Sequence, residues 1–254
     1  MNKRIPAVIL LALPTLFNRQ SSKGNSVLKK TLGQFHEFIK FFLTKNILGS
    51  LFSGIRKKDM RRKEPEKAEN LIKCAFKLFS ERGIAQVNVD AIAAEAGVTK
   101  GSVYHHFKSK HELILGACQN YYQNWQHNTY QKIFKAKTSK EKLEIAIRYS
   151  VKNCLLDEKN RVFTLDILTM SIQNEEVRRS WGQFLKTCHQ FFTGLVNQAI
   201  KDGEIDECDN VDERVNFMLC AMEGVKQQAI FDRSSCSREN EEKIIQSLLK
   251  SLTS

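Results

Sequence analysis

The scarcity of proline is the feature that most constrains the fold of this chain. It has 254 residues and three prolines, and no proline follows Pro65. Because proline breaks the interior of a helix, its absence leaves the rest of the chain free to be helical. Over the same stretch apolar residues recur at spacings of three and four, the period of one helix face. The sequence therefore predicts an all-α fold beyond residue 65.

Helix-start and helix-stop signals divide this stretch into nine predicted helices. Pro65 suits a first helical position, and Gly203 suits the end of a long helix. Three segments have the spacing of a capping box: Ser109–Glu112, Thr138–Glu141 and Asn210–Glu213. The predicted helices span residues 65–82, 89–96, 100–106, 110–134, 139–156, 160–172, 175–202, 211–232 and 239–252.

The net charge of +12 says little about the folded part, because it is unevenly distributed. Residues 1–60 contain 11 basic and 2 acidic side chains, whereas residues 119–254 contain 19 of each. A basic average is therefore weak support for nucleic-acid binding by the folded part. Residues 61–118 carry a smaller excess, with 10 basic and 7 acidic side chains.

The cysteines argue against a disulfide framework and a zinc site. Seven occur singly, without a Cys-x-x-Cys pair or histidines at metal-ligand spacing. An odd number of scattered cysteines in apolar helical patterns fits reduced thiols. The sequence therefore predicts a cytoplasmic protein without a bound metal. The cysteines are Cys74, Cys118, Cys154, Cys188, Cys208, Cys220 and Cys236.

Residues 1–59 differ from the rest and are expected to lie outside the folded part. Ile5–Phe17 is an apolar run that resembles a secretory signal but is too short to span a membrane. Leu28–Leu43 would form a basic amphipathic helix suited to a membrane surface. The favoured alternative is that translation begins at Met60, so no stable membrane insertion is expected.

A helix-turn-helix is predicted for residues 87–106. Apolar residues in Val89–Ala96 form one face of a short helix, Gly97 permits a turn with positive φ, and Thr99 can cap a second helix. The outer face of the second helix then carries short hydroxyls, a cation, a phenol and an imidazole. Such groups reach phosphates and base edges when a helix enters the major groove. They are Thr99, Lys100, Gly101, Ser102, Tyr104 and His105.

Three stretches carry a resemblance to a known family. Ala75–Gly83, Val89–Ala93 and Ala96–Leu113 together resemble the DNA-binding domain of the TetR family of regulators. The resemblance covers roughly residues 64–124, whereas residues 125–254 are similar to the family only in pattern.

The resemblance implies a DNA-binding domain at 64–124 and an effector-binding and dimerisation domain at 125–254. It implies a homodimer on a near-palindromic double-stranded operator, usually as a repressor that an unknown small effector releases. DNA contacts are implied for the outer face of the second helix, for Lys110 at a helix start and for Asn88. The family usually has threonine at position 88; asparagine keeps the capping role there but leaves a phosphate contact open.

An effector pocket is predicted among the helices of residues 110–232, because they carry more aromatic area than a small bundle needs. Asp166 and Glu223 interrupt apolar runs and could bind a cationic ligand beside an aromatic ring. The plainer alternative is that each carboxylate pairs with a lysine or arginine or points to solvent. The candidate residues are Tyr121, Trp125, Tyr149, Phe163, Asp166, Trp181 and Glu223.

The last two long helices are predicted to form the dimer interface, since they offer much apolar surface. The alternative is that these side chains are ordinary core. The candidates are Leu219, Met222, Ile245, Leu248 and Leu249.

An enzyme is the competing class, because Cys188 and His189 are adjacent in the apolar second half. Neighbouring residues on a helix point in different directions, and no nucleophile, base and orienting group can be placed together. The sequence therefore predicts a DNA-binding regulator without catalytic residues or a cofactor.

Overall fold

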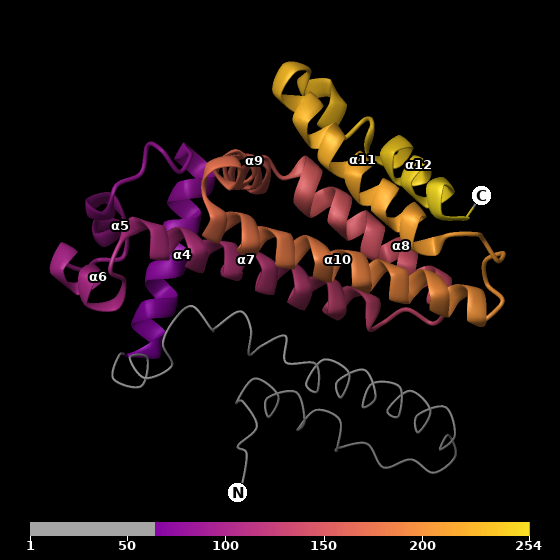
Figure 1. Ribbon diagram of the computed structural model, residues 1–254, viewed down its shortest axis with the longest axis horizontal. Helices are drawn as coiled ribbons and strands as arrows, with labels where there is room; N and C mark the ends of the chain where they lie inside the picture. The colour runs from indigo at the N-terminus through magenta and orange to yellow at the C-terminus, as the bar shows by residue number, and fades with distance from the viewer. Residues whose placement is uncertain (1–63, 254) are drawn as a thin grey trace, which may run out of the picture. The chain divides into compact units, whose positions relative to one another are not determined.

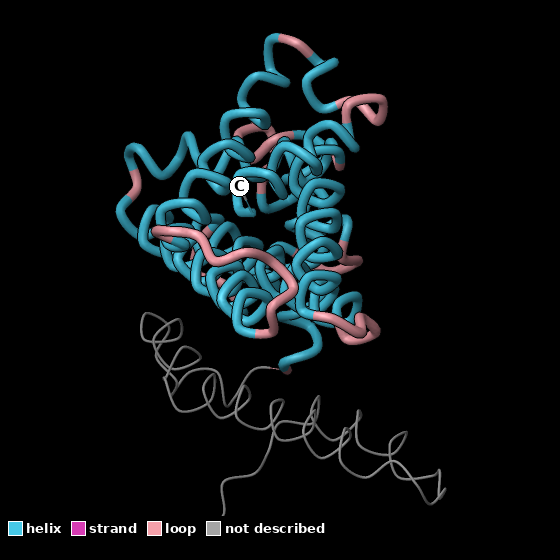
Figure 2. Tube along the Cα trace, turned by 90° about the vertical axis from the view of Figure 1, so that its right-hand side faces the viewer, coloured by secondary structure: helices cyan, strands magenta, loops and turns pink. Residues whose placement is uncertain are grey.

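The computed structural model describes residues 64–253, which lie within one compact unit, Met60–Ser254. As predicted, these residues contain helices and short connecting loops but no strand (Figure 2). None of the described helices is long and apolar enough to cross a membrane. The expectations about residues 1–59 lie outside the described residues.

The nine predicted helices are confirmed across residues 64–253, most of them to within two residues at each end (Figure 1). They are α4 (Pro65–Arg82), α5 (Val89–Glu95), α6 (Lys100–His106), α7 (Lys110–Ile133), α8 (Ser139–Ser150), α9 (Glu158–Gln173), α10 (Glu175–Lys201), α11 (Val211–Phe231) and α12 (Glu241–Thr253). A 3₁₀ turn, η3 (Arg233–Cys236), joins the last two.

The segment predicted as one helix over 139–156 is two elements. After α8 the backbone widens into a π-helical turn, η2 (Val151–Leu156). The Asp157 N–H donates to the Lys152 carbonyl five residues back, at 3.0 Å. The spacing of apolar residues does not predict the π-helical turn, because η2 still buries residues such as Leu155. Turns of this kind are frequent at functional sites.

Side-chain caps set the starts of two helices as predicted. Ser109 Oγ accepts a hydrogen bond from the Glu112 N–H at 3.3 Å, and Thr138 Oγ1 accepts one from the Glu141 N–H at 3.1 Å. The third predicted cap is wrong. Asn210 lies in the left-handed region, with a φ of 55°, and makes no side-chain cap bond. Asparagine tolerates this conformation better than most residues. Asn210 therefore begins α11 through its backbone conformation and not through a side-chain cap.

The described residues pack around two hydrophobic cores. The first core joins α4, α5, α6 and the first half of α7 with parts of α9 and α10. Figure 1 shows α4 crossing α7, with α9 beside it. Its largest buried side chains include Leu71, Leu78, Phe79, Ile92, Leu113, Tyr121, Phe163, Ile167 and Trp181.

The second core joins the last part of α7 with α8, η2, α10, α11, η3 and α12. Helix α11 packs against α10, and α12 packs against α8 and α11. Phe184 and Cys154 pack against both cores. The cores therefore do not follow the expected division at residue 124, because α9 contributes to the same core as the helix-turn-helix.

Candidate nucleic-acid interface

Local sequence fixes the geometry of α5 and α6. Asn88 Oδ1 accepts a hydrogen bond from the Ala91 N–H at 2.8 Å and begins α5. Gly97 has a φ of 66°, a conformation that favours glycine, and turns the chain towards α6. Thr99 Oγ1 then accepts a hydrogen bond from the Ser102 N–H at 3.2 Å. The predicted caps and turn are present, and they leave one face of α6 outside the core.

The outer face of α6 carries the side chains that the sequence singled out. Tyr104 is 46% exposed, and Val103 behind it is fully buried. Ser102 is half-buried, as is Lys110 at the start of α7. The remaining predicted contact residues are exposed: Asn88, Thr99, Lys100, Gly101 and His105.

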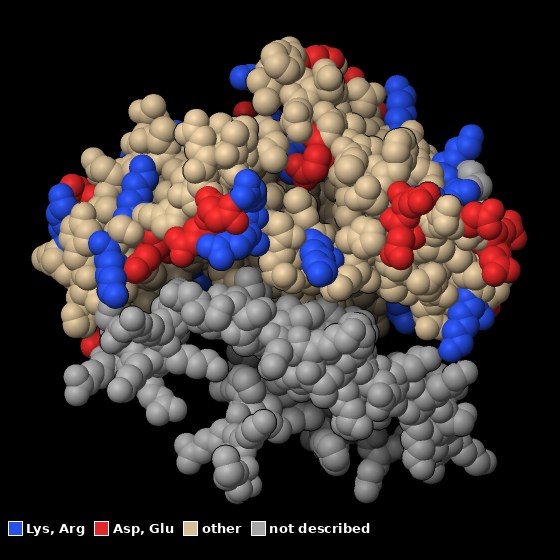
Figure 3. Space-filling view, viewed as in Figure 1, with Lys and Arg blue, Asp and Glu red and all other residues tan. Residues whose placement is uncertain are grey.

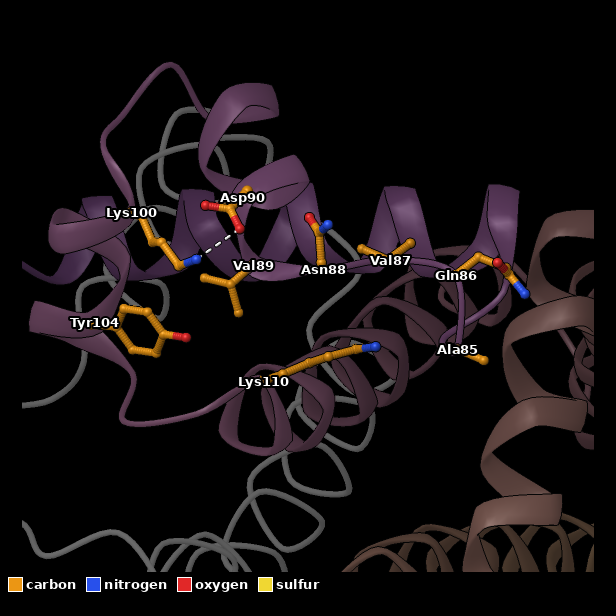
Figure 4. A pocket seen from close by; sticks show the side chains of 9 residues that line it. All are labelled: Ala85, Gln86, Val87, Asn88, Val89, Asp90, Lys100, Tyr104 and Lys110. Carbon is orange, nitrogen blue, oxygen red and sulfur yellow. Dashed lines mark hydrogen bonds and ion pairs between the residues drawn. The ribbon is translucent and has the colours of Figure 1, made fainter.

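A hollow of about 450 Å³ lies between this face and the loop before α5. It is lined by Lys100, Tyr104, Lys110 and residues 85–90. Figure 4 shows the Tyr104 hydroxyl directed into the hollow and the Lys110 side chain extending along one side. Two cations, a phenol and an amide so arranged can bind phosphate oxygens and base edges.

Asp90 is a member of this surface that the sequence analysis did not single out. Its Oδ2 lies 2.8 Å from Lys100 Nζ. The hydrogen bond and charge of Asp90 raise the pKa of Lys100, which therefore stays charged. A phosphate that binds Lys100 must compete with this carboxylate.

Lys110 is held at the opposite side of the hollow. Its Nζ donates to the Ile84 carbonyl at 2.6 Å, and burial lowers the pKa of Lys110. The N–H of the same Ile84 donates to Asp166 Oδ2 at 2.6 Å. Asp166 lies on α9, so charged side chains from two helices hold the loop that leads to Asn88. The sequence could not predict this hydrogen bond, because Ile84 and Asp166 are 82 residues apart in the chain.

The predicted effector residues divide into a packed aromatic group and two separate carboxylates. Tyr121, Trp125, Phe163 and Trp181 are buried, and Tyr149 is half-buried. The rings of Tyr121 and Trp181 lie 5.7 Å apart. The ring of Phe184 contacts those of Tyr121, Trp125 and Trp181. Among the described residues these ring contacts join Tyr121, Trp125, Phe163 and Trp181 into one cluster, and none of them includes Tyr149.

The two carboxylates do not share a site. Asp166 accepts from the Ile84 N–H, whereas both oxygens of Glu223 accept from Lys226 Nζ, at 2.7 and 2.9 Å. Each is therefore occupied by a partner within the chain, which matches the plainer alternative more closely than a joint cation site.

The predicted dimer residues lie in or beside the second core of their own chain. Met222, Ile245 and Leu248 are buried in the second core of their own chain, at 5%, 0% and 5% exposure. This burial matches the alternative that these side chains are ordinary core, because an apolar helical stripe has the same pattern whichever surface it packs against. Leu219 and Leu249 are half-buried and pack against the same core.

The surface charge of the described residues is mixed. On the face shown in Figure 3, lysine and arginine side chains lie beside aspartate and glutamate side chains. This matches the balanced count in residues 119–254. Any preference for DNA therefore depends on the local arrangement around α6.

Comparisons with known proteins agree with this geometry. Residues 71–117 match the model of the bacterial regulatory proteins of the tetR family. The uncharacterized HTH-type transcriptional regulator YerO of Bacillus subtilis is 46% identical over 56 residues, 22% of this chain and 19% of YerO. The fatty acid metabolism regulator protein of the same organism is 28% identical over 148 residues, 58% of this chain and 75% of that protein. The chain thus spans only about a fifth of YerO.

The likeness of fold extends further than the likeness of sequence. The crystal structure of a transcriptional regulator from Saccharomonospora viridis, in complex with choline, superposes with a TM-score of 0.65 at 19% identity. The match covers 74% of this chain and 95% of that one.

The helical fold and the α5–turn–α6 surface define a helix-turn-helix transcriptional regulator. The part of the chain that contains the helix-turn-helix is similar to the tetR family of bacterial regulatory proteins, as the resemblance of its N-terminal helices implied. The relatives that it matches are regulators rather than enzymes.

Proposed function

We propose that the protein is a homodimeric, non-enzymatic repressor that binds a near-palindromic operator through α6 and leaves it when a small effector binds. In a symmetric dimer the two recognition helices would lie about 34–36 Å apart, or a multiple of this, to reach successive major grooves. The seven cysteines, all free, suit the reducing cytoplasm, where we place the protein.

The observation that carries the proposal is the hollow beside α6. It joins the donors of Lys100, Tyr104 and Lys110 to the exposed cap of α5. Val103, on the opposite face of α6, anchors the helix in the first core. The helix can therefore enter a groove without unfolding any part of that core.

Substitution on α6 tests the DNA contact. Lys100→Ala should weaken binding to the protein's own upstream promoter DNA about tenfold and reduce the slope of log affinity against log salt by about one. Tyr104→Phe should weaken binding less, since only the hydroxyl is lost. Fluorescence anisotropy across a salt series measures both quantities.

Lys186→Ala is the matched control, because Lys186 is an exposed cation on α10. It should leave both affinity and slope unchanged. If Lys100→Ala and Tyr104→Phe bind the operator as the parent does, α6 is not the recognition helix.

The outward face of α11 supports a revised dimer interface. Phe217 is 65% exposed, and Cys220 and Gly224 continue the same helical stripe. Open space surrounds Gly224, so a second helix can approach closely there. We therefore move the interface from the buried stripe of α11 to this exposed one.

Phe217→Glu should convert a dimer into a monomer, because two carboxylates would face each other across a two-fold axis. Gln123→Glu, at an exposed position on α7, is the control and should remain dimeric. Sedimentation equilibrium at micromolar concentration distinguishes these outcomes. A Phe217→Glu dimer would place the interface elsewhere.

A further inference from the structure

The second core contains a buried ammonium group in the part of the chain assigned to effector binding. Lys226 on α11 is 2% exposed, and its Nζ donates to both carboxylate oxygens of Glu223, one helical turn earlier. Desolvating two charges costs free energy that their attraction often fails to recover. An apolar pair would hold this position at least as well, so packing alone does not explain the lysine.

A second cation lies near the same place. Arg161 of α9 and Lys226 both act electrostatically on the Cys236 thiol. Arg161 Nη1 donates to the Leu155 carbonyl at 2.6 Å, near the end of the π-helical turn η2. It is thus directed to a backbone oxygen, whereas Glu223 is the carboxylate that pairs with Lys226.

The two partners of the ion pair differ in their access to water. Glu223 is 30% exposed, whereas Lys226 is almost completely covered. Glu223 can therefore turn to solvent at small cost, but Lys226 cannot follow it. A ligand carboxylate that arrives along this side can replace Glu223 and leave the buried ammonium compensated.

The surroundings of the pair suit an apolar ligand body. Helix α11, which carries the ion pair, packs against η2, and the ring of Tyr121 packs against Trp181 and Phe184. Its hydroxyl donates to Cys154 Sγ of η2 at 3.3 Å. The residues beside the ion pair are therefore continuous with the packed aromatic group at the junction of the two cores.

We propose that the effector is an amphiphilic carboxylate, whose carboxylate displaces Glu223 from Lys226 and whose apolar body enters between the aromatic rings. The inference rests on the proposed effector-controlled function and replaces the cation expected from the sequence. Glu223 acts as an internal competitor that occupies the lysine until the ligand arrives.

Three probes with one carbon skeleton test the charge requirement. The full chain is titrated with decanoate, decanol and decylamine below their aggregation concentrations, and binding is measured by calorimetry and thermal shift. Decanoate should bind at least about tenfold more tightly than decanol, because charge-assisted hydrogen bonds are strong. Decylamine should bind more weakly than either, because it would meet Lys226.

Variants of the two partners should change the affinity in opposite directions. Lys226→Met should remove the preference for decanoate over decanol. Glu223→Gln should strengthen decanoate binding about tenfold, because it removes the competing carboxylate. Lys226→Met combined with Glu223→Gln removes both charges, so it should fold as the parent does and show no preference for decanoate.

A site with a purely structural ion pair would give equal decanoate affinities in the parent and the double variant, and that result would overturn the proposal. Tighter decylamine binding that Glu223→Gln weakens would overturn it in favour of a cation, as would failure of all three probes to bind the parent. Operator affinity is measured separately. A chain that binds decanoate in the predicted pattern but no operator would refute the proposed function and leave this site standing.

Discussion

The two hydrophobic cores differ in how they combine the parts of the chain. The first core mixes the helix-turn-helix with α9 and the start of α10, from the second half of the chain. The second core is built from α7 onwards and contains no residue of α4, α5 or α6. The helix-turn-helix therefore shares its core with α9 and α10.

This difference indicates how an effector signal could reach the operator. A conformational change confined to the second core must reach the first core through residues that pack against both cores, such as Phe184 and Cys154. A change in α9 acts on the first core directly, through Phe163 and through the bond between Asp166 and Ile84. Effects on DNA binding should therefore follow the core to which a residue belongs rather than its place in the sequence.

The largest expected difference between the two cores comes from truncating one large buried side chain in each of them. Phe163 and Phe192 are 0% and 1% exposed, so Phe163→Ala and Phe192→Ala should each cost about 3–5 kcal/mol of unfolding free energy. Only Phe163→Ala should loosen α4, because the Phe163 ring packs edge-on against Phe76 at 5.0 Å.

Denaturant titration gives the loss of stability, and hydrogen exchange of the α4 amides gives its location. Equal exchange of α4 in the two variants, at equal loss of stability, would contradict the division into two cores.

Removing the Asp166 carboxylate should have the next largest effect. Asp166→Ala leaves the nearly buried Ile84 N–H without its acceptor, at a cost of about 1–3 kcal/mol. Operator affinity should fall as well, because the same loop carries Asn88 and holds Lys110. Binding isotherms and hydrogen exchange at Ile84 measure the two effects.

Asp166→Asn keeps an acceptor and should restore most of the affinity. Lys159→Met removes a surface ion pair with Glu81, 2.7 Å long, that joins α9 to α4, and it should have a smaller effect. The coupling through Ile84 is rejected if Asp166→Ala and Lys159→Met bind the operator equally well.

Acid should weaken the attachment of α12 in the second core, with the smallest effect of the three. Hydrogen bonds from Arg148 and Gln246 lower the pKa of Glu242 to about 2, from an ordinary value of 4.5. A depressed folded-state pKa stabilises the protein above pH 4.5, and this contribution is lost as the pH falls from 4.5 towards 2. Since Arg148 lies on α8, acid should loosen the attachment of α12 to that helix.

Glu242→Gln should reduce the difference between the thermal midpoints at pH 6 and pH 3. Glu213→Gln, at an exposed carboxylate of α11, should leave that difference as in the parent. An unchanged difference in Glu242→Gln would show that the ion pair does not fasten α12.

The candidate site was largely predictable because its determinants are local. Asn88, Gly97 and Thr99 act through neighbours within a few residues, so their spacing alone predicts the turn and both caps. The partner of Lys100 was not predicted, because Asp90 lies on the preceding helix and reaches it only across the turn. The left-handed Asn210 was missed for a similar reason, since a capping pattern does not reveal backbone conformation.

The sequence by itself determined the all-α class, most of the helix boundaries and the outer face of α6, because helical period, capping and turn chemistry act over a few residues. Only the tertiary structure decided which apolar stripe of α11 is core, which core receives α9, and that Lys226 is buried beside Glu223. These depend on contacts between segments far apart in the chain. A stripe looks the same in sequence whether it meets its own chain, a second copy or a ligand.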